Sequence, residues 1–150
     1  MHKLVVALAL AALGVSPAIA SQETDVMVPV HQFITGFNKG HSKVAQAACA
    51  DSIFIIDDFP PHAWSGSGAI SKWLHDLDSF EKKNGTSDPS VTLGKPRQVD
   101  VTGTDAYVIV PTKLSYKKKG QLVKETGNMT FVLHKGAAGW RIAAWSWTDD

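Results

Sequence analysis

Hydrophobic residues recur at helical spacing near the start of the chain. Residues 25–39 place apolar side chains three or four positions apart, which predicts a helix with one buried face. Pro29 would lie in the first turn, where its missing N–H costs little, and Gly40 would end the helix. The apolar positions of this face are Val26, Val30, Phe33, Ile34 and Phe37.

Two further helices are predicted in the first half of the chain. Residues 41–50 predict a short helix with Ser42 as the candidate N-cap, and residues 53–56 then predict a short buried strand. Residues 69–83 carry a wide apolar stripe, which predicts an amphipathic helix. The stripe consists of Ile70, Trp73, Leu74, Leu77 and Phe80.

From residue 91 the hydrophobic pattern alternates with a period of two. Residues 84–90 are rich in turn-forming residues and predict a loop. Four alternating segments separated by glycine-containing turns then predict an antiparallel meander. Helices grouped before strands predict an α+β domain, with three N-terminal helices packed on a curved, mostly antiparallel sheet that can enclose a conical cavity. The four segments are residues 91–103, 105–120, 122–136 and 139–150.

The first twenty residues have the organisation of a signal peptide. A basic start precedes an apolar run from Leu4 to Val15, and Ala18-Ile19-Ala20 matches the small-residue cleavage pattern. The apolar run is shorter than the roughly 20 residues that span a bilayer. We therefore expect residues 1–20 to be removed, leaving residues 21–150 as a single secreted or periplasmic domain with no membrane anchor.

Charge and cysteine content narrow the classes of partner. The chain has 15 basic and 14 acidic residues, and removal of Lys3 with the signal peptide makes these numbers equal. A neutral domain has no net positive charge to attract nucleic acid. The basic run at residues 117–119 predicts a solvent-exposed hairpin tip. Cys49 is the single cysteine, so it forms no intramolecular disulfide, and we expect it to pack as a small buried hydrophobe.

Three segments of the chain resemble the NTF2-like superfamily, and within it the SnoaL-like and ketosteroid-isomerase-like proteins. "FITGFNKGH" is similar to the end of the family's first helix, and "AACADSIFIIDD" to the Ala-Asp-Asp motif before its first strand. "GNMTFVLHKGAAGWRIAAWSW" is similar to its closing hairpin. The resemblance implies a cone-shaped pocket and a homodimer formed through the sheet, but the family includes enzymes and non-catalytic binding proteins, so it leaves the function open.

The resemblance also assigns roles to individual positions. Asp57 matches the general base of the ketosteroid-isomerase pattern. The tyrosine that would stabilise the enolate oxygen aligns with Phe33, and the protonated acid falls near Met129 or Thr130. Because neither position offers the expected donor, the resemblance does not predict steroid isomerisation by that mechanism.

Two interpretations of the segment after the first strand remain open. Asp57 and His62 are an acid/base pair of a SnoaL-like lyase or isomerase, or Asp57 and Asp58 cap the strand end at an ordinary turn. No metal-ligand spacing such as His-x-His or Cys-x-x-Cys occurs, and no cofactor motif is found. We expect neither a metal nor a cofactor.

Aromatic residues favour a binding function. We expect a small apolar ligand in the conical pocket, and a purely structural role if side chains fill that space. Strict alternation places Trp145 and Trp147 on one face of the last strand and Ile142 on the other, without saying which face lines the pocket. The predicted ligand-binding residues are Phe33, Phe37, Trp64, Trp73, Tyr107, Met129, Phe131, Trp145 and Trp147.

Overall fold

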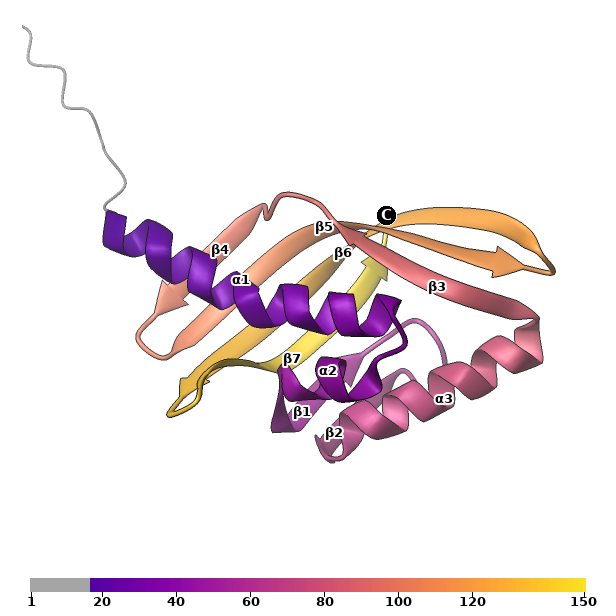
Figure 1. The fold of residues 1–150 in the computed structure, drawn as a ribbon, viewed down its shortest axis with the longest axis horizontal. Coiled ribbons are helices and arrows are strands. Elements are labelled where there is room, and N and C mark those ends of the chain that lie inside the picture. Colours follow the sequence, from indigo (N-terminus) through magenta and orange to yellow (C-terminus); the bar gives the residue numbers. More distant parts are fainter. Residues whose placement is uncertain (1–16) are drawn as a thin grey trace, which may run out of the picture.

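The computed structural model describes residues 17–150 as helices that cover one side of a strongly curved sheet (Figure 1). The helices are α1 (Pro17–Asn38), α2 (Ser42–Ala47) and α3 (Ala69–Asn84). The strands are β1 (Cys49–Ile56), β2 (Ala63–Ser67), β3 (Thr86–Leu93), β4 (Gln98–Thr102), β5 (Asp105–Lys118), β6 (Gln121–Gly136) and β7 (Gly139–Asp149). The predicted α+β order is confirmed, although α3 follows two strands. Most of the predicted signal peptide lies outside the described residues.

The first two helices differ from the prediction at their N-termini, and α2 ends at Ala47, because residues 49–50, predicted as helix, belong to β1. Helix α1 begins at Pro17, so Pro29 lies inside it, and the predicted position in the first turn is wrong. An internal proline removes one backbone hydrogen bond, and here the buried face on both sides of it holds the helix together. The N-cap of α2 is His41, which makes no side-chain cap, so the prediction for Ser42 is also wrong. Gly40, in the left-handed conformation (φ 65°), follows the end of α1 as predicted.

The sheet is mixed and contains more strands than the sequence pattern predicted. Its strand order is β2-β1-β7-β6-β5-β3, and β4 also pairs with β5. Strands β1 and β7 are parallel, whereas the other pairs are antiparallel. Residues 84–90 were predicted as a loop and no strand was predicted over residues 63–67, because the first half of β3 and the whole of β2 are polar segments at sheet edges. The predicted strand over residues 91–103 is broken between β3 and β4, where Gly94 N–H donates to the carbonyl of Pro111 at 2.7 Å.

A β-bulge in the last strand changes which residues share a face. Leu133 pairs with Ile142 and Val132 with Ala144, so Ala143 is an extra residue in β7. The bulge shifts the alternation by one position. Ile142 is consequently buried on the same side as Trp145 and Trp147, and the predicted separation of Ile142 from the two tryptophans is wrong.

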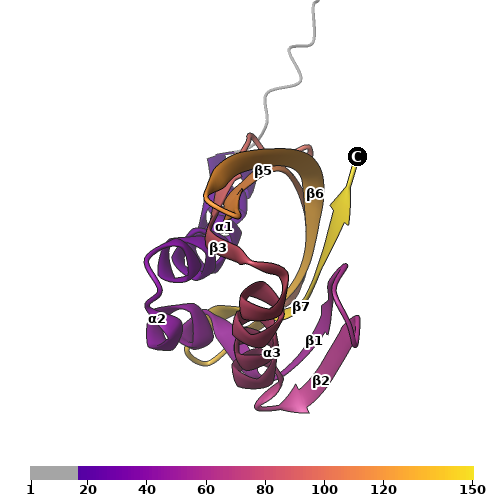
Figure 2. The ribbon, with the colours of Figure 1, turned by 90° about the vertical axis from the view of Figure 1, so that its right-hand side faces the viewer.

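The concave side of the sheet and the helices form one apolar core. Strands β5 and β6 bend over the helices, while α1 and α3 pack against the sheet from the inside (Figure 2). Phe33 on α1 and Phe131 on β6 are fully buried at this junction. Cys49 is buried as predicted, and burial raises the pKa of its thiol to about 12. No helix within residues 17–150 is long and apolar enough to cross a membrane.

Candidate functional site

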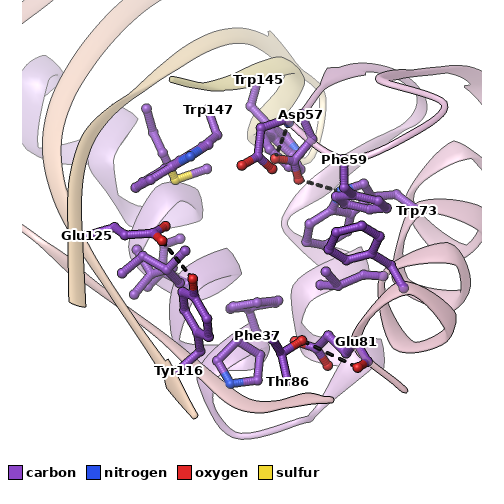
Figure 3. A pocket seen from close by; sticks show the side chains of 18 of the residues that line it. Phe37, Asp57, Phe59, Trp73, Glu81, Thr86, Tyr116, Glu125, Trp145 and Trp147 are labelled. Carbon is purple, nitrogen blue, oxygen red and sulfur yellow. Dashed lines mark hydrogen bonds between the residues drawn. The ribbon is translucent and has the colours of Figure 1, made fainter. Parts of the chain in front are cut away.

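A cavity of about 290 Å³ opens between the helices and the concave side of the sheet (Figure 3). Helices α1 and α3 form one part of its wall, the segment after β1 forms another, and the inward faces of β3, β5, β6 and β7 complete it. The lining residues are Phe33, Ile34, Phe37, Asp57, Asp58, Phe59, Trp73, Leu77, Phe80, Glu81, Asn84, Thr86, Pro89, Val91, Leu114, Tyr116, Lys118, Glu125, Met129, Trp145 and Trp147.

Packed aromatic rings form the apolar wall of the cavity. Trp73 on α3 and Trp145 on β7 meet edge to face, with ring centroids 4.9 Å apart at 86°. Phe33 packs against Trp145 at 5.7 Å, and Phe37 packs against Trp73 at the same distance. Tilted and edge-to-face contacts of this kind stabilise the rings beyond their burial alone. The wall is therefore held by contacts between its own members.

Asp57 is the polar group embedded in this wall. Its Oδ2 accepts a hydrogen bond from Trp73 Nε1 at 2.8 Å, and its Oδ1 accepts one from the backbone N–H of Asp58 at 2.9 Å. Burial raises the pKa of the Asp57 carboxyl to about 6, against the opposing effect of these two hydrogen bonds. A carboxyl group with such a pKa is able to accept and return a proton near neutral pH.

A second polar pair, Tyr116 and Glu125, lies across the cavity from Asp57 (Figure 3). Tyr116 Oη donates to Glu125 Oε1 at 2.7 Å, linking β5 to β6. The hydrogen bond to Glu125, aided by desolvation, raises the pKa of the Tyr116 hydroxyl to about 12. Glu81 on α3 also lines the cavity, and burial raises the pKa of its carboxyl. The cavity thus has an apolar wall and polar groups on several sides.

Seven of the residues predicted for the site lie in the cavity lining. They come from α1, the segment after β1, α3, β6 and β7, which are far apart in sequence. Phe33 and Met129 are among them, at positions where the family pattern expects hydrogen-bond donors. The seven are Phe33, Phe37, Asp57, Trp73, Met129, Trp145 and Trp147.

His62 lies outside the cavity. Its ring Nδ1 is 3.3 Å from the backbone carbonyl oxygen of Asp57, and the side chain is exposed. The Asp57 carboxylate instead accepts from Trp73 Nε1 and from the backbone N–H of Asp58. The structure therefore does not bring the two side chains together as an acid/base pair.

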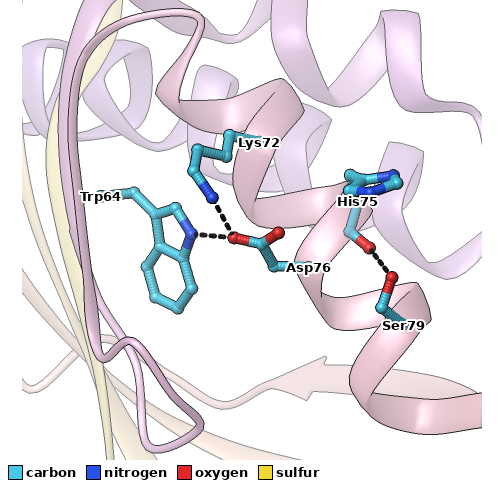
Figure 4. A network of polar contacts seen from close by, with 5 residues as sticks. All are labelled: Trp64, Lys72, His75, Asp76 and Ser79. Carbon is cyan, nitrogen blue, oxygen red and sulfur yellow. Dashed lines mark hydrogen bonds and ion pairs between the residues drawn. The ribbon is translucent and has the colours of Figure 1, made fainter. Parts of the chain in front are cut away.

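Three predicted aromatic residues also lie elsewhere. Trp64 on β2 is buried against α3, where its Nε1 donates to Asp76 Oδ2 at 2.8 Å (Figure 4). Lys72 Nζ lies 2.6 Å from the same oxygen. Phe131 on β6 is fully buried in the core and is not part of the cavity lining. Tyr107 is 40% exposed. Its neighbours Ala106 and Val108 on β5 point inward, so Tyr107 lies on the outer face of the sheet.

The sequence interpretation missed the polar pair on the long β5–β6 hairpin. By the alternation along β6, the side chain of Glu125 points inward like those of Met129 and Phe131. On β5, Tyr116 points inward like Val110. The pairing of β5 with β6 runs without a register shift from Asp105 to Lys118. Extending the alternation toward the hairpin tip would therefore have identified both residues.

Solved structures with this architecture come from several bacteria. An NTF2-like superfamily protein from Salmonella enterica superposes with a TM-score of 0.72 at 16% identity, over 87% of this chain and 92% of that one. A ketosteroid isomerase-like protein from Erwinia carotovora gives 0.68 at 19% identity, over 85% and 95%. A proposed dehydratase of the NTF2-like family from Streptomyces avermitilis gives 0.72 at 15% identity, over 87% and 98%.

These comparisons define the fold of the chain. No protein-family model matches the sequence, and no curated protein sequence matches it either. The resemblance drawn from the sequence is confirmed at the level of structure, because the neighbours are NTF2-like and ketosteroid isomerase-like proteins. At these identities the likeness concerns the fold, and function has to be argued from the cavity.

Proposed function

We propose that this chain, which has the NTF2-like fold, binds a small, mostly apolar molecule in the cavity between its helices and sheet. The observation that carries the proposal is the open space of about 290 Å³ beside the packed aromatic wall. Ligand pockets are typically about 300–1,000 Å³ and mainly apolar, with a few polar groups that fix orientation. The cavity lies at the lower end of this range, which favours a compact ligand.

The arrangement of the wall supports binding of an apolar body. The rings of Phe33, Trp73 and Trp145 already contact one another, so a ligand requires little reordering of side chains. Transfer of apolar ligand surface from water to this wall contributes roughly 25 cal/mol per Å² before the costs of association. Asp57 and the Tyr116–Glu125 pair then orient the polar part of the ligand.

Filling the cavity tests this proposal. Leu114 lines it from β5, and Leu114→Trp is expected to occupy the space that the ligand needs. The matched control is Leu122→Trp, at a position of the same hairpin that is 63% exposed and is not part of the lining. Isothermal titration with 1-naphthol as the probe should give measurable binding to the wild type and to Leu122→Trp, and at least about tenfold weaker binding to Leu114→Trp. Equal binding by all three proteins would place the probe outside the cavity and contradict the proposal.

A second candidate function, proton transfer by Asp57, is favoured by one observation. The carboxyl lies against the aromatic wall of the cavity, accepts a hydrogen bond from the Trp73 indole, and has a pKa raised by burial to about 6. Among the similar structures are a ketosteroid isomerase-like protein and a proposed dehydratase. In this function Asp57 removes a proton from a carbon next to a carbonyl group and returns it elsewhere, while Tyr116 and Glu125 contact the opposite end of the substrate.

We also propose that the chain is exported and cleaved after Ala20. The basic start, apolar run and small-residue end support this. The cut would lie within the first turns of α1 and before Val26, the first fully buried side chain described. N-terminal sequencing of protein from outside the cytoplasm should give Ser-Gln-Glu-Thr, and a chain that still begins at Met1 would contradict export with cleavage.

The outer face of the sheet suggests that the domain pairs with a second copy of itself. Phe54, Val132 and Tyr107 are each 40% to 46% exposed and form a row across the sheet, joined through Ala144. A continuous exposed apolar row of this kind is typical of an interaction surface. Sedimentation velocity should give a dimer for the wild type and a monomer for Val132→Lys, whereas a wild-type monomer would contradict the proposal.

A further inference from the structure

The cavity combines aromatic rings with an excess of acidic groups. Eight aromatic side chains line it, together with four carboxylates and, among the described lining residues, a single base. That base, Lys118, is exposed near the hairpin tip. Because the mature domain has equal numbers of acidic and basic residues, this negative character is local to the cavity. The four carboxylates are those of Asp57, Asp58, Glu81 and Glu125.

None of these carboxylates is neutralised by a cationic side chain in the described part of the chain. The ion pairs there use Asp76, Asp78, Asp88 and Asp105, which lie outside the lining. Glu125 accepts instead from the Tyr116 hydroxyl, and Asp57 from the Trp73 indole and a backbone N–H. These neutral donors orient the carboxylates but leave their charge uncompensated.

The titration behaviour of the cavity agrees with this charge distribution. The pKa values of Asp57, Glu81 and Tyr116 all lie above their ordinary values. Burial is the main cause for the two carboxyl groups, and the hydrogen bond to the Glu125 carboxylate is the main cause for Tyr116. Desolvation disfavours the charged form of each buried carboxyl, and the neighbouring negative charges of Asp58 on Asp57, and of Glu125 and Asp58 on Tyr116, raise these pKa values further. An anionic ligand would therefore meet repulsion on several sides.

We infer that the ligand of this cavity is an organic cation: an amine or quaternary ammonium group on a compact apolar body. This inference rests on the proposed binding function and names the chemical class of its ligand. Aromatic faces attract cations through their quadrupoles, and the attraction increases when water is excluded. When such a cation leaves water it loses its hydration, and the negative charges of Glu81, Glu125 and Asp57 compensate for this loss. The aromatic wall accommodates the rest of the molecule.

Three probes of nearly equal shape test the inference by isothermal titration. They are benzyltrimethylammonium, its neutral carbon isostere neopentylbenzene, and the anion phenylmethanesulfonate. The wild type should bind the cation at least about tenfold more tightly than the neutral isostere, and the anion least tightly. Because the attraction is electrostatic, the preference for the cation should decrease as salt concentration rises.

Charge-neutral variants locate the preference in the cavity. Glu125→Gln and Glu81→Gln should each weaken cation binding by roughly threefold to tenfold and leave binding of the neutral isostere unchanged. The matched control is Asp78→Asn, which removes a carboxylate from the exposed surface of α3, near Glu81 in sequence but outside the lining. This control should bind the cation like the wild type.

The outcomes separate the inference from the proposed function. If the neutral isostere binds as tightly as the cation, and Leu114→Trp weakens both, the cavity binds apolar molecules and the cation inference is wrong. If the cation binds but Glu125→Gln, Glu81→Gln and Leu114→Trp leave its affinity unchanged, it binds elsewhere and the inference is again overturned. If no probe binds the wild type, the binding function fails together with the inference.

Discussion

Gly127→Ala is expected to destabilise the domain by roughly 2–3 kcal/mol and to disturb the cavity. A methyl group at residue 127 of β6 would overlap the backbone carbonyl oxygen of Thr148. It would also lie 2.8 Å from Cζ2 and 2.9 Å from Cη2 of Trp147, which lines the cavity. Because a backbone atom and a packed ring are both in the way, neither a rotamer change nor a small side-chain shift relieves the overlap.

Gly136→Ala is the matched control for this prediction. Gly136 also belongs to β6, but no described atom lies within 4 Å of the position its Cβ would take. Urea unfolding followed by circular dichroism should show a large loss of stability for Gly127→Ala and a change within about 0.5 kcal/mol for Gly136→Ala. Equal stabilities of the two variants would mean that β7 does not approach β6 as closely as described.

Asp57→Asn is expected to stabilise the folded domain at pH 7 and to remove the proton transfer proposed for this carboxyl. Burial raises the folded-state pKa of Asp57 from 3.8 to about 6, so the folded protein binds this proton more tightly than the unfolded chain. The wild type therefore loses stability as pH rises from about 4 to about 6, and the full cost remains at pH 7. Asparagine avoids this cost, and its amide oxygen still accepts the hydrogen bond from Trp73.

The stabilisation should depend on pH in one direction. At pH 7 the variant should exceed the wild type by roughly 1–2 kcal/mol, less than the shift alone implies because Asp57 retains some contact with solvent. The difference should disappear near pH 4, and Asp51→Asn, at an exposed aspartate of β1, should show no such dependence. Urea unfolding across this range measures it. A variant less stable than the wild type at pH 7 would show that the Asp57 carboxylate stabilises the fold.

The same variant tests the second candidate function. In D2O, wild-type protein should accelerate deuterium incorporation next to the carbonyl of small ketones such as cyclohexanone, and Asp57→Asn should not. A gain of stability together with a loss of exchange is expected when a buried charge lowers stability but is needed for activity. A variant that retains full exchange would exclude Asp57 as the base.

Local patterns predicted the parts of the fold in which hydrophobic periodicity is strong. The apolar stripe of α3 and the long strands β5, β6 and β7 are examples. Strand β2 and the first half of β3 were missed because they lie at sheet edges, where pairing partners rather than apolar side chains define a strand. The bulge at Ala143 was missed because it depends on the register between two strands.

The residues of the candidate site could also be predicted only in part from the sequence. Asp57 and the two tryptophans of β7 follow from the family pattern and from aromatic composition. His62 was placed with Asp57 because the two are close in sequence, but its ring lies near the Asp57 backbone carbonyl and the carboxylate is held by Trp73 instead. Tyr116 and Glu125 meet only because β5 and β6 pair along their whole length, which no local pattern states.

Native mass spectrometry of the protein purified from its own host tests whether the cavity holds a small-molecule ligand. We expect a dimer of chains that begin at Ser21, with a small organic molecule retained at gentle ionisation and released at higher collision energy. Leu114→Trp prepared in the same way should give the protein mass alone. If the wild type also carries no molecule, and gives the same spectrum after incubation with excess 1-naphthol, the cavity is not a binding site and the proposed function is wrong.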